Sequence, residues 1–313
     1  MRAMIIEEFG GEEKIKSVDV PKPQPQDNEI LVKIAYAGVN PVDWKIREGM
    51  IEQLLPHVFP IILGWDMAGT VESIGSKVSS YKVGDKVYGY CRKPQVQHGC
   101  YAEYITVDEE AIALLPEKLN FAEAAGIPLV GLTAWQCLFD FANLQAGETV
   151  LIHAGAGGIG SLAIQFAKHK GAKVYTTASA KNHEYVKNLG ADYVIDYNTS
   201  DFVDVILQEE PQKLNVVYDT VGGETQQKSA ALIKEGGTLV SIVSPPDESL
   251  APNIKSGFVF VSPNAKQLKE ISNLIKEDKV QIPAITEMKL EEAAEALRIN
   301  REGHVRGKLV LKV

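Results

Sequence analysis

Short apolar runs rich in β-branched residues dominate the first third of the chain, and turn-forming residues separate them. Three prolines fall within residues 21–25, and Val83-Gly84-Asp85 forms a second break. Runs of this length, bounded by turns, predict a compact barrel-like domain of short strands over residues 1–124. The predicted strands are residues 2–6, 29–37, 68–74, 86–89 and 101–107.

From about residue 125 the pattern changes, because apolar runs of strand length alternate with segments that carry apolar residues at helical spacing. This alternation predicts an α/β fold with a doubly wound parallel sheet over residues 125–262. The predicted strands of this sheet are residues 149–153, 173–177, 193–196, 215–219, 238–243 and 257–261, and the predicted helices include residues 159–170 and 181–189.

The end of the chain contains a helical segment over residues 265–277, a further segment over 290–300 and a final strand over 308–313. This tail is too short to form a domain alone, so we expect it to fold back onto the N-terminal domain. The sequence therefore predicts two domains, one made of residues 1–124 with 263–313 and the other of residues 125–262.

A glycine loop, Gly155-Ala156-Gly157-Gly158-Ile159-Gly160, joins the first strand of the parallel sheet to its first helix. In a G-x-G-x-x-G loop the first glycine permits a tight turn, the second leaves room for a pyrophosphate, and the third lets helix and strand pack closely. The free N–H groups at the helix start would face the phosphates. A turn without a ligand is the alternative, although one glycine would suffice for it. These residues therefore predict a Rossmann dinucleotide site.

Composition restricts the partners of the protein. Its 313 residues carry a formal net charge of −9, with 45% hydrophobic and 23% charged residues, so nucleic acid and anionic membranes are disfavoured and a small-molecule partner is expected. Glu7 and Glu8 stand where a signal peptide would need an apolar core, which favours a cytoplasmic location. The three cysteines, Cys91, Cys100 and Cys137, lack C-x-x-C spacing and are expected to be reduced thiols.

Two spaced motifs carry a family resemblance. They resemble the signature of the medium-chain dehydrogenase/reductase superfamily. The first motif is Gly64-Trp65-Asp66 followed by Gly69, Gly75 and Val78, and the second is Val83-Gly84-Asp85-Lys86-Val87. In the zinc alcohol dehydrogenases of that superfamily a histidine ligand occupies the position of Trp65, and a cysteine ligand lies near the position of Asn40. Neither tryptophan nor this asparagine suits a tetrahedral zinc site, so no catalytic metal is expected.

The segments Gly38-Val39-Asn40-Pro41-Val42-Asp43-Trp44-Lys45 and Gly131-Leu132-Thr133-Ala134 resemble the zinc-independent branch, which contains quinone oxidoreductases and enone or alkenal reductases. The resemblance implies a GroES-like β-barrel-type catalytic domain that the C-terminal tail completes, beside a Rossmann domain. It also implies a homodimer joined through the strand at residues 257–261, whose apolar run is expected at the sheet edge.

The cofactor choice depends on the end of the second strand of the parallel sheet. An NAD site usually places a carboxylate there, but this chain reads Thr177-Ala178-Ser179-Ala180-Lys181, which would accept a 2′-phosphate and favours NADPH. By resemblance, Ser179, Lys181 and Tyr197 are expected around that phosphate. Ser179 could equally be a helix N-cap, and Lys181 a solvated first-turn lysine.

Without a metal, reduction of an electron-poor quinone or conjugated enone is the easier reaction, with hydride passing from nicotinamide C4. Candidate donors to the developing oxyanion are the Asn40 amide and the Lys45 ammonium, which could also supply the proton in place of water. Trp65 could form a flat wall of the acceptor pocket, and by resemblance Thr133 lies beside the nicotinamide. The alternatives are a turn for Asn40, an exposed helix position for Lys45 and core packing for Trp65.

Two other functions remain open from the sequence. The first is a reductase of enoyl thioesters, and the second is an NADPH-binding sensor or partner protein with little turnover. Zinc alcohol dehydrogenase activity is disfavoured by Trp65.

Overall fold

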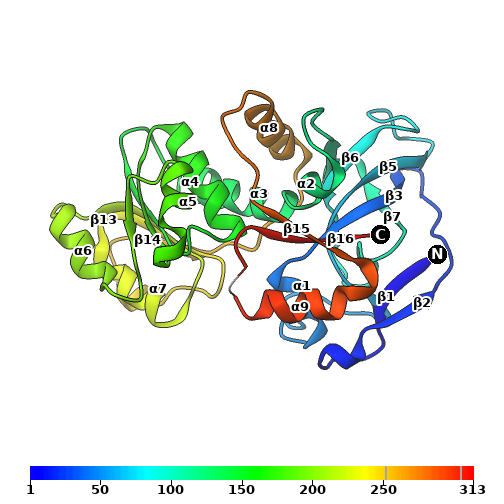
Figure 1. Cartoon of the computed structure of the whole chain (residues 1–313), viewed down its shortest axis with the longest axis horizontal. Helices are drawn as coiled ribbons and strands as arrows, with labels where there is room; N and C mark the ends of the chain where they lie inside the picture. Colours follow the sequence, from blue (N-terminus) through cyan, green and yellow to red (C-terminus); the bar gives the residue numbers. More distant parts are fainter. Residues whose placement is uncertain (251, 304) are drawn as a thin grey trace. The chain divides into compact units, whose positions relative to one another are not determined.

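The computed structural model describes residues 1–250, 252–303 and 305–313 (Figure 1). The chain forms two compact units. The first contains Met1–Leu132, Ser262–Glu277 and Ile282–Val313, and the second contains Thr133–Val261 and Asp278–Gln281. The first unit extends beyond residue 124 to Leu132, and its helix α2 (Phe121–Ala125) packs against strands of its sheet.

The first unit is built around a seven-stranded sheet in the order β15-β16-β3-β5-β6-β8, with β7 also paired to β3. A separate three-stranded sheet has the order β2-β1-β4. The strands are β1 (Arg2–Ile6), β2 (Lys16–Asp19), β3 (Glu29–Gly38), β4 (Ile61–Ile62), β5 (Asp66–Ile74), β6 (Lys86–Tyr90), β7 (Tyr104–Asp108), β8 (Ile112–Leu114), β15 (Ile285–Lys289) and β16 (Lys308–Lys312).

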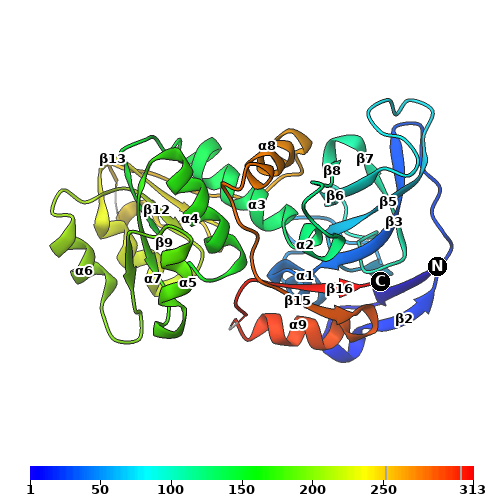
Figure 2. The same ribbon diagram turned by 45° about the horizontal axis from the view of Figure 1, so that its top comes forward.

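The C-terminal strand β16 lies between β15 and β3, and its pairing with β3 is antiparallel (Figure 2). The expected return of the tail to the N-terminal domain is therefore confirmed. The strand predicted over residues 101–107 is shorter than expected, because Tyr101 pairs with Leu63 and Met4 before the pairing with β3 begins at Tyr104.

Three further helices belong to the first unit, α1 (Pro41–Arg47), α8 (Ala265–Lys276) and α9 (Ala293–Arg301). Helix α8 buries an apolar stripe of Leu268, Ile271 and Ile275, spaced three and four residues apart as one helix face requires. Tyr88 Oη of β6 donates a hydrogen bond to the carbonyl of Leu268 at 2.9 Å, which fixes this helix to the sheet.

The second unit holds a six-stranded sheet in the order β11-β10-β9-β12-β13-β14, with every neighbouring pair parallel. This order confirms the predicted doubly wound sheet, and the order in which strands are added switches sides between β9 and β12. The strands are β9 (Thr149–Ile152), β10 (Lys173–Thr177), β11 (Tyr193–Ile195), β12 (Leu214–Asp219), β13 (Ile233–Ser241) and β14 (Lys255–Phe258).

Strand β14 begins and ends earlier than the residues 257–261 predicted for it. Its partner β13 ends at Ser241, which pairs with Phe258 and accepts one more hydrogen bond from Val259. The apolar residues beyond Val259 therefore have no further strand to pair with, although the sequence pattern runs through them.

Apolar residues in register form the core on one face of the sheet. Tyr175, Leu151, Val217 and Leu239 align across β10, β9, β12 and β13, and Ile206 of α6 (Phe202–Glu209) joins the same cluster. The other helices of this unit are α3 (Pro128–Trp135, which starts in the first unit), α4 (Gly158–Lys170), α5 (His183–Asn188) and α7 (Gly223–Ser229) (Figure 1). No helix in the described residues is long and apolar enough to span a membrane.

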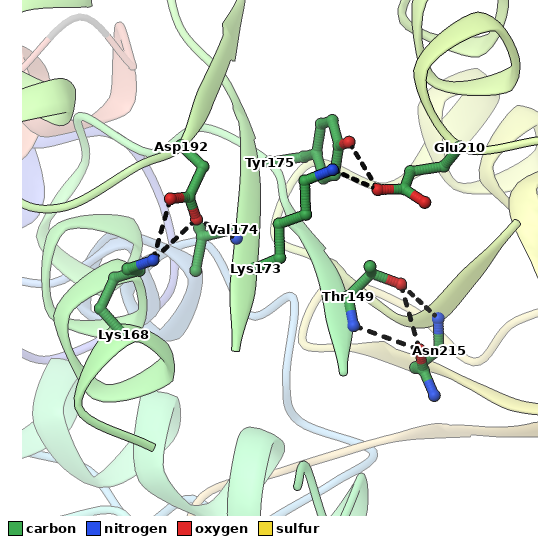
Figure 3. Close-up of polar contacts among 8 residues, drawn as sticks. All are labelled: Thr149, Lys168, Lys173, Val174, Tyr175, Asp192, Glu210 and Asn215. Atoms are coloured by element: carbon green, nitrogen blue, oxygen red, sulfur yellow. Dashed lines mark hydrogen bonds and ion pairs between the residues drawn. The ribbon is translucent and has the colours of Figure 1, made fainter. Parts of the chain in front are cut away.

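Hydrogen bonds and ion pairs between side chains connect the amino-terminal ends of the parallel strands to neighbouring segments (Figure 3). Thr149 and Asn215 exchange hydrogen bonds of 3.1 Å between β9 and β12. Lys173 and Tyr175 of β10 both donate to the carboxylate of Glu210, at 2.5 and 2.8 Å. These contacts fix the strand ends opposite the glycine loop, which follows β9 at its carboxyl end.

Candidate functional site

The first and last glycines of the loop are required by packing within the second unit. A Cβ on Gly155 would lie 2.1 Å from Thr176 Oγ1, and a Cβ on Gly160 would lie 2.4 Å from the carbonyl oxygen of Ala154. Ala154 itself adopts a φ of 51°, a conformation that is rare for a residue with a side chain and is found mainly in tight functional loops. The loop is therefore held close against both β10 and the start of α4.

The middle glycine has a different environment. A Cβ on Gly157 would meet only the carbonyl oxygen of Ala154, at 3.4 Å, so packing alone does not require glycine here. Gly157, Gly158 and Ile159 are only half-buried, and the first-turn N–H groups of α4 lack helical acceptors. A surface without side chains at a helix N-terminus fits a pyrophosphate, which binds to such N–H groups. The loop residues, including the buried Ala156, therefore fit the predicted dinucleotide.

The three residues predicted around the 2′-phosphate follow two paired strands. Thr177 of β10 pairs with Ile195 of β11, and Ser179 and Tyr197 each lie two residues beyond that pair. The segments carrying these two residues therefore leave the sheet at the same edge. Lys181 is exposed in the short turn after Ser179, and 56% of Tyr197 is exposed. Ser179 caps this turn through its backbone carbonyl, which accepts from the Asn182 N–H at 2.8 Å.

A carboxylate that sequence reasoning missed lies at the same edge. Asp196 directly follows β11 and accepts hydrogen bonds of 3.0 Å from the backbone and side chain of Asn198. These bonds, together with one from the backbone of Ala180, hold the pKa of Asp196 below its usual value. Its position directly before Tyr197, a residue predicted to lie at the 2′-phosphate, could have indicated it from the sequence.

His153 closes the base of the glycine loop and is buried. Its ring nitrogens lie 3.2 Å from Thr177 Oγ1 and 2.9 Å from Ser229 Oγ, and Phe202 packs edge-on against the ring. Burial lowers the pKa of His153 to about 4, so the imidazole is neutral at physiological pH. These contacts give His153 a structural role.

In the first unit, Asn40 lies at the start of α1 with no exposed surface. Its Nδ2 donates to Asp66 Oδ2 at 2.9 Å, and its Oδ1 accepts from Lys308 Nζ. Its backbone N–H donates to Asp43 Oδ2 at 2.8 Å, which fixes the first turn of α1. Asn40, predicted to donate to a developing oxyanion or to order a turn, is thus the centre of a buried polar cluster.

The cluster contains two carboxyl groups in different environments. Both oxygens of Asp66 accept hydrogen bonds, from Asn40 and from the backbone of Leu129 at 2.9 Å each, as expected for an ionised group. Asp43 Oδ2 accepts from Tyr101 Oη at 2.9 Å, whereas Asp43 Oδ1 has no hydrogen-bond partner among the described residues. Burial raises the pKa of Asp43 to about 7 and that of Asp66 to about 6.

Lys308 supplies the positive charge of this cluster. Only 4% of the residue is exposed, and Nζ also donates to the carbonyl of Val39 at 2.6 Å. Burial lowers the pKa of this lysine, while Asp66 and Asp43 act in the opposite direction. Lys308, Asp66 and Tyr101 were not predicted as site residues. Two features of the sequence could have indicated them. Asp66 is a charged residue directly after Trp65, and Lys308 directly precedes the apolar residues of the last strand.

The remaining predicted residues lie in the following places. Lys45 is half-buried on α1 with Nζ 5.7 Å from the centre of the Trp44 ring, and burial lowers its pKa. Trp65 is 4% exposed and packs edge-on against Tyr90. Thr133, the first residue of the second unit, is 3% exposed. Across the described ranges, no three His, Cys, Asp or Glu side chains form a group that could hold a metal ion.

A parallel doubly wound sheet with this glycine loop, joined to a mostly antiparallel unit, defines a two-domain dinucleotide-binding protein. Two family models match the chain. Residues 26–117 match the alcohol dehydrogenase GroES-like domain, and residues 189–311 match a zinc-binding dehydrogenase domain.

Several individual proteins are similar to this chain over nearly its whole length. A 2-methylene-furan-3-one reductase of Solanum lycopersicum is 36% identical over 99% of this chain and 79% of its own length. The structure of a quinone oxidoreductase from Coxiella burnetii is 38% identical, with a TM-score of 0.89 over 100% of this chain and 99% of that chain. The Escherichia coli quinone oxidoreductase complexed with NADPH is 26% identical, with a TM-score of 0.87 over 100% of both chains.

The chain therefore belongs to the medium-chain dehydrogenase/reductase superfamily, and quinone oxidoreductases and an enone reductase are among its relatives. The predicted family and the predicted combination of a GroES-like domain with a Rossmann domain are confirmed.

Proposed function

We propose that this protein is an oxidoreductase that uses NADPH to reduce quinones or conjugated enones and alkenals. The observation that carries the proposal is the open surface at Gly157, because packing requires Gly155 and Gly160 but leaves the middle of the loop without a structural reason for glycine. A cofactor with a pyrophosphate supplies that reason. The similarity to an enone reductase and to quinone oxidoreductases supports the class of acceptor.

NADPH, when bound, supplies a hydride from C4 of its nicotinamide ring to the quinone or to the β-carbon of the enone. The loop from Gly155 to Gly160 would hold the pyrophosphate, and Ser179, Lys181 and Tyr197 would hold the 2′-phosphate. Lys181 is an exposed cation, and β10 ends without a carboxylate that would accept hydrogen bonds from the ribose hydroxyls, which supports a phosphate at this position. The Asp196 carboxylate at the same edge follows β11 and is occupied by hydrogen bonds from Asn198.

On the acceptor side, Lys45 and Asn40 would donate hydrogen bonds to the acceptor oxygen that becomes negative during reduction. Lys45 is the more accessible of the two, because it is half-buried whereas Asn40 has no exposed surface. Lys45 or water then delivers the proton. As the resemblance implies, Trp65 would form a wall of the acceptor pocket and Thr133 would lie beside the nicotinamide.

The proposed reaction is zinc-independent. Trp65 and Asn40 stand at the positions where the resemblance places metal ligands, and an indole ring cannot coordinate zinc. Elemental analysis of the purified protein tests this directly. Zinc in stoichiometric amount would contradict the proposal.

The test of the proposed function is NADPH oxidation against a benzoquinone, a naphthoquinone, an alkyl enone, an alkenal and an enoyl thioester, with NADH in parallel. We expect turnover with a quinone, the enone or the alkenal, and weak turnover with NADH. Turnover confined to the thioester would assign the chain to enoyl-thioester reduction. NADPH binding without oxidation by any acceptor would support a binding protein instead.

We also propose a cytoplasmic homodimer. Strand β14 is the outermost strand of the six-stranded sheet, so its edge can pair with the same strand of a second copy. Sedimentation velocity tests this, with an expected species of twice the chain mass of 34.2 kDa. A species at the single chain mass at micromolar concentration would contradict the dimer.

A further inference from the structure

The side-chain amide of Asn40 lies between two buried groups of opposite charge that come from different strands. Lys308, the first residue of β16, donates to its oxygen, and Asp66, the first residue of β5, accepts from its nitrogen. Both residues are at most 4% exposed. Burial of a lysine or a carboxylate without a partner costs free energy. Asn40 lowers that cost by hydrogen-bonding to both charged groups.

Strand register brings these residues together. Gly38 at the end of β3 pairs with Asp66 on one side and with Val310 on the other, and the N–H of Val39 donates to the carbonyl of Leu309 at 3.0 Å. A Cβ on Gly38 would lie 2.9 Å from the Cβ of Asp66 and 2.3 Å from the carbonyl oxygen of Ala125. Glycine at this position therefore allows β5 to approach closely enough for Asp66 to reach Asn40.

The chemistry of the two partners fixes the direction of the amide. An ammonium group offers only donors and an ionised carboxylate offers only acceptors, so Lys308 selects Oδ1 and Asp66 selects Nδ2. A flipped amide would place its N–H groups against the ammonium and its oxygen against the carboxylate. Neutral partners such as serine or glutamine would accept either direction.

The amide carries two Nδ2 hydrogens, and Asp66 accepts one of them. Among the described residues, the other hydrogen has no partner. Because the charges on either side fix the amide, this uncommitted donor keeps one direction rather than exchanging with the oxygen.

We propose that Lys308 and Asp66 are positioning residues for the reaction, which act by fixing the orientation of the Asn40 amide and hence the direction of its remaining N–H donor. The proposal rests on the proposed reductase function, in which that donor faces the developing oxyanion. It adds to that function two residues, one from the start of β5 and one from the start of β16.

A purely structural role for Lys308 is the competing explanation, because the same ammonium donates to the carbonyl of Val39 at 2.6 Å. Loss of that bond would lower stability whatever Asn40 does. The test must therefore include a quantity that depends on Asn40 itself.

The first test is a double-mutant cycle on kcat, using wild type, Asn40→Ala, Lys308→Met and the double variant. We expect Lys308→Met to lower kcat by about 10-fold to 100-fold, with the KM for NADPH changing less than about threefold. In the Asn40→Ala background the same change should alter kcat by less than about twofold, because the residue through which Lys308 acts is absent. Equal effects in both backgrounds would overturn the proposal.

The matched control is Lys312→Met, which makes the same substitution at an exposed lysine of the same strand. Its kcat should equal that of wild type. If Lys308→Met does not fold, Lys308→Met combined with Asp66→Asn removes both charges together and keeps the cluster balanced. This variant leaves the amide free to flip, so the same loss of kcat is expected, and a wild-type kcat would overturn the proposal.

A second measurement does not depend on turnover. The side-chain NH₂ signals of Asn40 can be assigned in a ¹⁵N spectrum by their loss in Asn40→Ala. We expect slow solvent exchange of these protons in wild type and in Lys312→Met, and exchange at least about tenfold faster in Lys308→Met. Unchanged exchange would overturn the inference even in an active enzyme. An inactive wild-type protein that still shows the expected exchange would instead contradict the proposed function alone.

Discussion

Lys308 Nζ donates a hydrogen bond to Asn40 Oδ1 across 268 positions of the sequence, and both side chains are buried. The contact exists because β16 returns from the end of the chain to pair with β3. The C-terminal strand thus completes the polar cluster at the start of α1 as well as the sheet. The polar cluster around Asn40 therefore depends on residues from both ends of the chain.

Gly157→Ala should weaken NADPH binding and leave the fold intact. The new Cβ meets only one protein atom, at 3.4 Å, but occupies the surface that the pyrophosphate approaches. We expect the Kd for NADPH to rise by about tenfold or more, equivalent to about 1.4 kcal/mol, with an unchanged Tm. Fluorescence titration and thermal unfolding measure the two quantities.

The contrasting variant is Gly160→Ala, whose Cβ would lie 2.4 Å from the Ala154 oxygen and 2.7 Å from Gly155 Cα. This change should lower the Tm. Equal loss of stability in both variants would remove the distinction between ligand and packing on which the cofactor site depends.

Lys181→Ala should separate the two nicotinamide cofactors. Loss of a charge-assisted contact to the 2′-phosphate should raise the Kd for NADPH by about tenfold, with less than about a twofold change for NADH. Lys187→Ala, at an exposed lysine of α5, is the control and should change neither constant. A similar effect of Lys181→Ala on both cofactors would remove the phosphate role.

Lys45→Met should lower kcat by about 10-fold to 100-fold if the ammonium steadies the developing oxyanion. Burial lowers the pKa of Lys45, so the wild-type rate should fall as the pH rises through that lowered value, below the usual 10.5. The variant should lack this alkaline decline. Lys33→Met, at an exposed lysine of β3, should keep both the rate and the pH profile of wild type.

Asp43 should make stability depend on pH. Its pKa rises from 3.8 in the unfolded chain to about 7 in the folded protein, so the stabilising protonated form is present at low pH and is lost as the pH rises through about 7. Between pH 5 and pH 8, wild type should lose on the order of 2 kcal/mol of unfolding free energy relative to Asp43→Asn. Urea unfolding of both proteins at the two pH values measures the difference, and parallel behaviour would contradict a buried titration.

The sequence predicted those parts of the fold that depend on local patterns. The apolar runs at Arg2–Ile6 and Lys173–Thr177 are strands with the predicted bounds, and α4 ends at Gly171 with a φ of 88° as its glycine suggested. Strand β15 was missed because Thr286 and Glu287 are exposed, so it shows no apolar run. Its pairing with β16 depends on a tertiary contact that no local pattern reveals.

The residues of the candidate site likewise include some that a local sequence pattern predicted and some that it did not. The glycine loop was found because its glycines lie next to one another between a strand and a helix. Asp66 and Lys308 were missed because a charged residue is normally exposed, and only the register of β3, β5 and β16 buries this pair around Asn40. The exposure of Lys45 could also not be predicted, since it depends on how α1 packs against α9.

The central claim is that the chain transfers hydride from NADPH to an electron-poor acceptor. The most direct measurement uses NADPH deuterated at C4, prepared separately on each face of the ring, with an alkyl enone as acceptor. We predict that one of the two labelled cofactors delivers deuterium to the β-carbon of the saturated ketone, as seen by NMR of the product. A reduced product without deuterium from either cofactor, or bound NADPH that no acceptor oxidises, would contradict the account.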